Sequence, residues 1–300
     1  MYVSSGSLTD ETRKEVEDFS KWILDVGDGI LPGLLLSANG ESDWIRILDD
    51  LLIKDQGRGI QALIDNIYPN LKERYLDSSY LQERAIFVPK NVDVDKINSK
   101  MLSLIPGPTR CCLSADESCC GDRNLSNQDN MYPVEYLNSL KPNGIPDHCL
   151  ELKVGVPVVL LRNLDPSIRL CNGTRLIIQK IHTHIVEAKI ITGTNIGRLV
   201  FIPRTIMSPS DTNLPFVLRR RQFPLRISFA MMINKSQGQS LHRVGVFLPN
   251  PVFTHGQLYV AISRTTSRAS LKILILSQGK PVGYTRNVVY KDALGRVQNA

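Results

Sequence analysis

The sequence lacks the features that would assign it to a membrane or secreted class. It contains no low-complexity tract, no apolar stretch behind a basic N-terminal flank, and no apolar run of about 18 or more residues. We therefore expect neither a membrane-spanning helix nor a secretory signal. The 300 residues are 42% hydrophobic and 22% charged, as in globular proteins, and suffice for one large domain or two ordinary ones.

The cysteines lack the spacing of a metal site. None of them forms the C-x-x-C pattern that is typical of zinc ligands, although two adjacent pairs occur. The six are Cys111, Cys112, Cys119, Cys120, Cys149 and Cys171. We predict no metal ligands among them and interpret them as reduced thiols in a loop, which suits an intracellular protein.

A phosphate-binding P-loop is also missing. The Gly-Lys pair at 279–280 is followed by Pro281 instead of Ser or Thr, and Leu274 occupies the place of the first glycine in G-x-x-x-x-G-K-[ST]. Residues 44–50 superficially resemble a magnesium-binding strand. Because no P-loop precedes them, we interpret their two aspartates as an acidic loop.

Basic residues, in contrast, are abundant and concentrated. The formal net charge is +7, and six arginines lie between Arg198 and Arg226 against one acid, Asp211. The run Arg219-Arg220-Arg221 is the densest point. Clustered guanidinium groups favour a polyanionic partner such as nucleic acid through counterion release. A solvated basic loop explains the same charge equally well.

Periodicity predicts an α/β arrangement in the first half of the chain. Apolar residues recur at helical spacing over 9–26 and 59–75. A short apolar strand at 84–89 runs directly into a further helical pattern, which is half of a parallel β/α unit. Residues 107–146 are rich in turn formers and predict a long loop with one short helix near 134–140.

The pattern changes to short β-strands after residue 150 and returns to α/β after residue 225. The closely spaced strands predict a small barrel or meander inserted into the α/β domain, with members at 152–161, 174–181, 185–191 and 198–202. In the last part we predict strands at 226–230, 243–248 and 271–276, and helices that begin at Ser236 and Thr254. The polar tail after residue 277 is expected to be frayed.

The segment Asn234 to Leu241 has the composition of a phosphate-binding turn. An apolar strand leads into small and polar residues at a predicted helix start, where unpaired amides and the helix dipole favour an anion. Asn234 and Ser236 add side-chain donors, Lys235 adds charge, and Gly238 permits close approach of the backbone. Any well-capped helix would look similar.

The second candidate segment, Gln257 to Arg264, places an arginine at the end of a predicted helix. A guanidinium held there can reach across a domain interface and stabilise charge on a transferring γ-phosphoryl group. The alternative is that Arg264 interacts with the negative end of its own helix.

Taken in order, these segments resemble the petite-integration-frequency (Pif-type) DNA helicases, and in particular their plant and Helitron-transposon branch. The similarity extends over roughly residues 15–276. The segments that resemble the family are 84–98, 154–175, 219–241 and 256–264, and those that resemble the branch are 21–29 and 136–140. The resemblance implies the second RecA-like domain of a superfamily-one helicase, a parallel sheet flanked by helices, with an inserted Src-homology-like β-barrel. It covers only the C-terminal half of such an enzyme.

The resemblance also implies roles for individual residues. Asn234, Lys235 and Ser236 would hold a phosphate of single-stranded DNA, and Gln237 and Gly238 would couple the DNA to the nucleotide. The matching Arg264 would touch the γ-phosphate of ATP, so that it serves as both catalytic and cofactor-binding residue. From charge we add Arg219, Arg220 and Arg221 as DNA-binding candidates.

For the whole chain the resemblance implies the following partners and organisation. ATP and Mg²⁺ are the implied cofactors, single-stranded DNA or DNA junctions the partners, and the nucleus or mitochondrion the location, in DNA repair, recombination or telomere maintenance. We expect a helical linker at 1–83 leading out of a first RecA-like lobe encoded upstream, a second lobe at 84–146 and 225–276, the barrel at 150–224 and a tail at 277–300.

Three functions remain open at this point. The chain is the C-terminal portion of an ATP-dependent 5′–3′ DNA helicase that does not hydrolyse ATP alone, because a helicase also needs a nucleotide cradle and a metal carboxylate. Alternatively it is a stand-alone single-stranded DNA-binding module. The third possibility is a non-functional transposon-derived remnant with an exposed apolar interface.

Overall fold

The computed structural model divides the chain into two compact units. One unit comprises Met1–Asn70, Glu83–Ser99 and Phe229–Ala300, and the other comprises Leu71–Gln82 and Lys100–Ser228. We call them the parallel-sheet unit and the antiparallel-sheet unit. The structure describes residues 10–34, 43–54, 57–119, 132–209, 214–265, 267–276 and 281–290.

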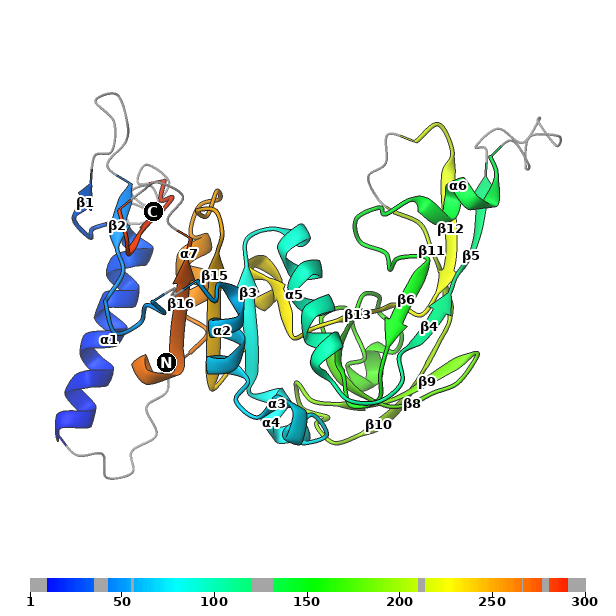
Figure 1. The fold of residues 1–300 in the computed structure, drawn as a ribbon, viewed down its shortest axis with the longest axis horizontal. Helices are drawn as coiled ribbons and strands as arrows, with labels where there is room; N and C mark the ends of the chain where they lie inside the picture. The colour runs from blue at the N-terminus through cyan, green and yellow to red at the C-terminus, as the bar shows by residue number, and fades with distance from the viewer. Residues whose placement is uncertain are drawn as a thin grey trace. The chain divides into compact units, whose positions relative to one another are not determined.

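A four-stranded parallel sheet forms the centre of the first unit (Figure 1). Its order is β14-β3-β15-β16, and each neighbouring pair is parallel. The strands are β3 (Arg84–Val88), β14 (Ala230–Met232), β15 (Arg243–Leu248) and β16 (Leu271–Ile275). The predicted parallel α/β arrangement is therefore confirmed, and the strands predicted at 84–89, 243–248 and 271–276 are present.

Helices cover both faces of this sheet. Alternate strand residues, such as Phe87 and Val246, join one core with α1 (Asp10–Asp28) and α7 (Gln257–Ile262). The residues between them face the other way, where α2 (Ile60–Ile67) packs on β15. Strand residues alternate between faces and apolar helix residues recur every three or four positions, so each helix buries one side against one face.

Further short elements complete this unit. Strands β1 (Gly33–Leu34), β2 (Trp44–Arg46) and β17 (Tyr284–Arg286) form a small antiparallel sheet. The tail beyond residue 277 was predicted to be frayed, and this is wrong for its described part, 281–290. Thr285 in β17 is buried, because pairing with β2 gives the polar tail a hydrogen-bonded partner that its own composition does not reveal.

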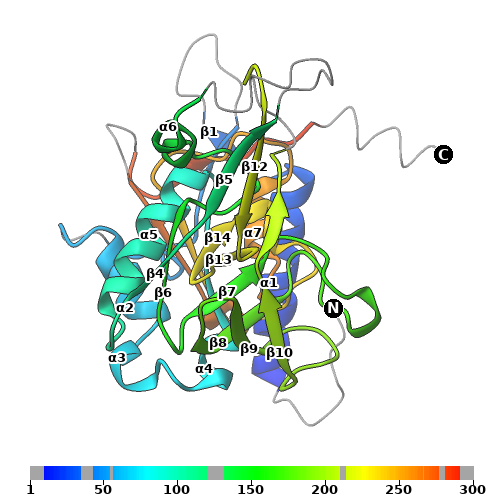
Figure 2. The ribbon, with the colours of Figure 1, turned by 90° about the vertical axis from the view of Figure 1, so that its right-hand side faces the viewer.

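The antiparallel-sheet unit contains a five-stranded sheet of order β10-β9-β8-β7-β13 (Figure 2). Its strands are β7 (Pro157–Leu160), β8 (Arg175–Ile181), β9 (Ile185–Ile190), β10 (Leu199–Pro203) and β13 (Leu225–Ile227). The predicted meander is confirmed. Among the described residues no pairing joins β10 to β13, so closure into a barrel stays a prediction.

The predicted long loop at 107–146 is wrong in its first part. It contains β4 (Arg110–Leu113), which pairs with β6 (Cys149–Leu152), and β5 (Ala115–Cys119). Strand β5 joins β12 (Val217–Gln222) and β11 (Thr205–Met207) in a three-stranded sheet. The partner strands lie up to about 100 residues away in sequence, so local composition did not reveal them.

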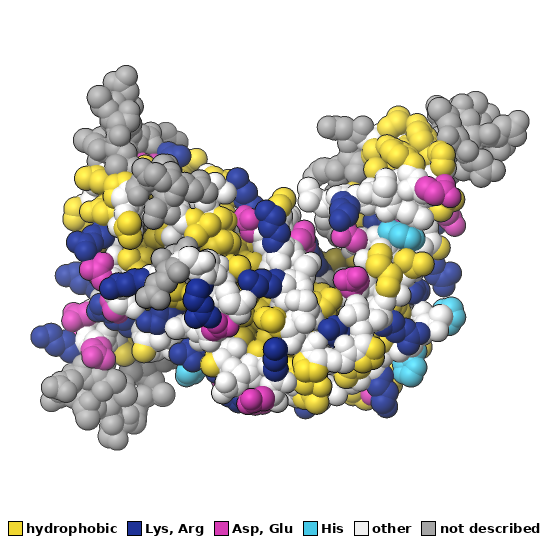
Figure 3. Space-filling view, in the orientation of Figure 1, with side chains coloured by type: hydrophobic (Ala, Val, Ile, Leu, Met, Phe, Trp, Pro, Cys, Tyr) yellow, Lys and Arg dark blue, Asp and Glu magenta, His cyan; other side chains and the backbone are white. Residues whose placement is uncertain are grey.

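The boundary between the units also differs from the predicted one. It falls within α5 (Asn91–Leu104), and residues 100–146 group with the antiparallel sheets instead of the parallel one. The helix predicted near 134–140 is present as α6 (Val134–Ser139). Apolar side chains gather on the surface over α6 and the start of β12 (Figure 3). The remaining helices are α3 (Leu71–Arg74) and α4 (Ser78–Gln82).

The cysteines are not all reduced thiols. Cys111 and Cys149 form a disulfide between β4 and β6, with Cα atoms 5.7 Å apart. Burial raises the pKa of the Cys112 thiol, and Cys120 lies outside the described residues. In the described parts of the chain no three His, Cys, Asp or Glu side chains gather as metal ligands. Within the same parts, every helix is too short or too polar to cross a membrane.

Candidate nucleic-acid interface

The loop after β14 carries the first group of predicted site residues. A 3₁₀ turn, η2 (Ile233–Ser236), replaces the α-helix that was predicted to begin at Ser236. Gln237 is extended and Gly238 has φ 76°, so the chain leaves the turn instead of winding on. No α-helix N-terminus therefore exists here, and the helix-dipole argument for an anion site is wrong.

The side chains of this loop differ in their access to solvent. Asn234, Lys235 and Gln237 are exposed and free to meet a ligand. The Ser236 side chain is buried, and its hydroxyl donates to the Ile233 carbonyl at 2.6 Å. Ser236 therefore holds the turn together, and the prediction that it contacts DNA phosphate does not fit its position.

Arg264 is the second residue after α7 and contacts that helix. Its Nε donates to the Val260 carbonyl at 3.0 Å and its Nη2 to the Ser263 hydroxyl at 2.8 Å. The predicted helix from Thr254 begins only at Gln257, because Gly256 is left-handed with φ 67°. Arg264 therefore contacts the C-terminal end of its own helix, which is the alternative that the sequence left open. Its Nη1 atom has no partner among the described residues.

The two motif segments meet in space. Helix α7 packs against η2, and the Leu241 amide donates to the Arg264 carbonyl at 2.9 Å. Leu241 and Ile262 share the same core, which fixes the loop against the helix end. The loop itself, 233–241, contains no acidic residue. The loop offers exposed amide and ammonium donors, and the arginine whose backbone it contacts has a half-buried side chain. Donors of these types bind phosphate oxygens.

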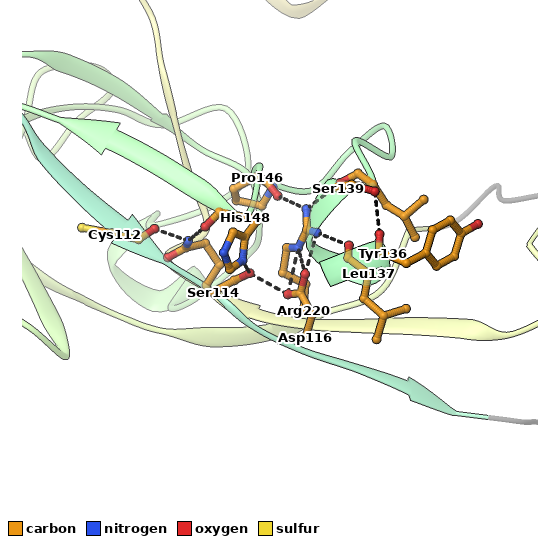
Figure 4. Close-up of polar contacts among 11 residues, drawn as sticks. Cys112, Ser114, Asp116, Tyr136, Leu137, Ser139, Pro146, His148 and Arg220 are labelled. Atoms are coloured by element: carbon orange, nitrogen blue, oxygen red, sulfur yellow. Dashed lines mark hydrogen bonds and ion pairs between the residues drawn. The ribbon is translucent and has the colours of Figure 1, made fainter. Parts of the chain in front are cut away.

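The arginine run at 219–221 lies on β12, where successive side chains point to opposite faces. Arg220 is fully buried, and its guanidinium binds both carboxylate oxygens of Asp116 at 2.6–3.0 Å. It also donates to the carbonyls of Leu137 and Pro146 (Figure 4) and to that of Leu140. The prediction that Arg220 binds DNA is therefore wrong: its donors are used and no solvent reaches it.

A polar network extends from this ion pair. The Ser114 hydroxyl donates to Asp116 at 2.6 Å and lies 2.8 Å from Nδ1 of His148 (Figure 4). Because a hydroxyl has one proton, His148 must donate to Ser114 through Nδ1. Gln222 closes the network by donating to the carbonyls of Cys112 and His148. The arrangement anchors β5, β12 and the region of α6, and is structural.

Arg219 and Arg221 lie on the other face of β12 and remain accessible. Arg221 is exposed, and Arg219 exposes 43% of its side chain. The hydrogen bond to Cys119 and the charge of Glu117, 4.0 Å away, raise the pKa of Arg219, which stays protonated. A strand period applied to residues 218–222 would have found the division, because Leu218, Arg220 and Gln222 alternate with the exposed arginines.

Comparison with known proteins gives a consistent relationship. Residues 135–181 match the family model described as the 2B domain of the DNA helicase Pif1. The chain is 30% identical over 185 residues to the human ATP-dependent DNA helicase PIF1, and this covers 61% of the chain and 26% of that protein. It is 33% identical over 127 residues to the Trypanosoma brucei helicase PIF6, covering 41% of the chain and 16% of that protein.

Solved structures with the same fold are also Pif1 helicases. The crystal structure of Pif1 from Candida albicans matches with a TM-score of 0.56 and 20% identity, over 94% of this chain and 57% of that one. Bacteroides Pif1 bound to single-stranded DNA matches with a TM-score of 0.51 and 19% identity, over 85% and 57%. At this identity the likeness concerns the fold alone.

The fold and the matched structures define the class: an α/β protein with a parallel sheet. The sequence matches go one step further and relate this chain to the Pif1-type ATP-dependent DNA helicases. The chain spans about a quarter of the length of the curated relatives that it matches most extensively.

Proposed function

We propose that this chain is the C-terminal portion of an ATP-dependent DNA helicase that moves 5′ to 3′ along single-stranded DNA. The observation that carries the proposal is the hydrogen bond between Leu241 and Arg264, which joins the donor-rich loop to the arginine. In this role Asn234 and Lys235 hold a DNA phosphate, and Gln237 and Gly238 respond to the nucleotide. The plant and Helitron-like branch of the family is part of the proposal.

The residues of this chain account for a contact with the γ-phosphate of ATP but not for the rest of the nucleotide site. The sequence has no P-loop, and the described residues contain no cluster of carboxylates for Mg²⁺. A first RecA-like lobe would hold the triphosphate and the metal, which supply the phosphoryl-transfer chemistry. Arg264 would then exchange its contact with the Val260 carbonyl for an oxygen of the γ-phosphate, and its unpaired Nη1 gives a second donor.

A second candidate is a stand-alone module that binds single-stranded DNA without a motor. It is favoured by the accessible pair Arg219 and Arg221 together with the missing P-loop. Both candidates require the same DNA contact, and they differ in ATP turnover. The burial of Arg220 means that the pair, and not the full run of three, should be tested.

The test compares the salt dependence of DNA binding between two charge-reversed variants. Arg219→Glu with Arg221→Glu should weaken binding to single-stranded oligonucleotides and flatten the plot of log K against log salt by about 0.7 per lost phosphate contact. The control reverses Arg13 and Lys14, both exposed on α1, and changes the net charge equally. Fluorescence anisotropy across a range of salt concentrations measures both.

Equal slopes for the two variants would contradict a DNA contact at Arg219 and Arg221. A wild-type protein that binds no single-stranded DNA at low salt would contradict both candidate functions.

A further inference from the structure

Strand β10 (Leu199–Pro203) lies at one edge of the five-stranded sheet (Figure 2). It presents apolar side chains to solvent. Phe201 is 61% exposed and Leu199 is 47% exposed. On the neighbouring strand β9, Ile185 is 41% exposed and pairs with Pro203 at the end of β10. We call Ile185, Leu199 and Phe201 the outer strip. All three belong to the antiparallel-sheet unit.

Folding of the sheet does not require these residues to be apolar. The side chains between them, Val200 and Ile202, are buried and supply the contribution of β10 to the core. Strand alternation places the outer strip on the opposite face, where a polar residue would serve the fold as well. A single exposed apolar residue needs no explanation, but a phenylalanine beside two aliphatic residues on one edge indicates a ligand surface.

The charged residues around the outer strip indicate which kind of ligand would bind there. Lys189 lies directly opposite Leu199 in the ladder. Glu187 lies opposite Phe201, but only 14% of its side chain is exposed and its carboxylate is 3.6 Å from the ammonium of Lys180. Lys180 itself is 67% exposed. Lys180 and Glu187 offset each other, so Lys189 leaves a net positive charge beside the outer strip, which complements a polyanion and not a neutral apolar surface.

We propose that Phe201 is a stacking platform for an unpaired base of single-stranded nucleic acid, with Lys189 contacting a flanking phosphate. An exposed aromatic ring with nearby ammonium groups is the combination with which proteins bind single strands without reading sequence. Duplex bases are stacked inside the helix and cannot reach such a ring. This inference rests on the proposed binding of single-stranded DNA and assigns a second surface for it, in a different unit from the loop at 233–241.

The test replaces Phe201 by alanine and by tryptophan. Phe201→Ala should weaken binding of oligo-dT about tenfold, and Phe201→Trp should retain it, because stacking on one aromatic side chain contributes that order of affinity. Phe201→Ala should leave the salt slope unchanged, because no charge is removed. Phe253→Ala in the parallel-sheet unit, where the ring is 54% exposed, is the matched control and should bind as wild type.

An abasic oligonucleotide of the same length separates stacking from any other loss. It keeps the phosphates but has no base, so wild type and Phe201→Ala should bind it equally. Fluorescence of Phe201→Trp, measured against the wild-type background of its two tryptophans, should be quenched by oligo-dT and not by the abasic strand.

The inference is overturned if wild type binds oligo-dT and Phe201→Ala binds it equally well. It is also overturned if the alanine variant loses the same affinity for the abasic strand. Loss of self-association in Phe201→Ala, with DNA affinity unchanged, would assign the outer strip to a protein contact instead. These results differ from failure of the proposed function, in which wild type itself binds no single strand.

Discussion

At the scale of single residues, Arg220 shows how burial decides the role of a charge. Its neighbours Arg219 and Arg221 have the same chemistry, but they face solvent, whereas Arg220 meets Asp116 in a buried ion pair. Removing one partner of such a pair leaves the other charged, buried and unsatisfied. The cost of that loss is much larger than the net value of the pair itself.

We therefore expect Arg220→Met to lower the free energy of unfolding by about 3–5 kcal/mol. Arg221→Met, one position along the same strand, should change it by less than about 0.5 kcal/mol. Chemical denaturation of both variants measures the difference. Equal stabilities would show that Arg220 is not buried as described.

At the residue scale the sequence showed where charged residues lie in the chain but not which of their side chains face solvent. Arg219, Arg220 and Arg221 form one feature in the composition, and the alternation of strand β12 divides them, with Arg220 facing the protein interior. Ser236 is a similar case, because its hydroxyl is suited to bind phosphate but donates to Ile233 within the turn. Asn234 and Lys235 are exposed, as the predicted site requires.

At the scale of elements, Gly245 controls how closely α2 approaches β15. A Cβ atom at this position would lie 2.7 Å from Cγ1 of Ile67 and 3.0 Å from Cδ1 of Leu63. Both side chains are fully buried and have little room to move. The absence of a side chain in the strand thus allows the helix to pack against the sheet.

We expect Gly245→Ala to destabilise the protein by about 1–3 kcal/mol through overpacking. Ile67→Ala alone should cost about 2–5 kcal/mol. The double variant should cost less than the sum, because removal of Cγ1 of Ile67 makes room for the new methyl group. Thermal or chemical unfolding of the two single variants and the double variant gives a double-mutant cycle. Strictly additive changes in the free energy of unfolding would contradict the contact between positions 245 and 67.

Elements with strong local signals were predictable and those stabilised by distant partners were not. The apolar strands β3, β15 and β16 and the amphipathic helix α1 follow directly from periodicity. Strands β5 and β17 are polar and gain stability from pairing with β12 and β2. The helix predicted to begin at Ser236 does not form, because Gly238 has a positive φ and the chain leaves the turn there.

At the scale of the whole molecule, the missing P-loop predicts that this chain does not hydrolyse ATP by itself. Phosphoryl transfer needs a cradle and a metal site as well as an arginine. We expect no release of phosphate above background, with or without single-stranded DNA. Phosphate release by wild type and Arg264→Ala, assayed side by side, measures this. Turnover that vanishes in Arg264→Ala would contradict the prediction, whereas a contaminating enzyme would be unaffected by the substitution.

The sequence alone determined the parallel α/β arrangement, the antiparallel meander and the relationship to Pif1-type helicases, because these depend on local periodicity and on contiguous motifs. Tertiary structure decided which side chains of those motifs are accessible. It buried Arg220 and Ser236, left Asn234, Lys235 and Phe201 at the surface, and brought Leu241 to Arg264. The physical reason is that exposure and pairing depend on strands and helices far apart in the chain, whose contacts no local pattern encodes.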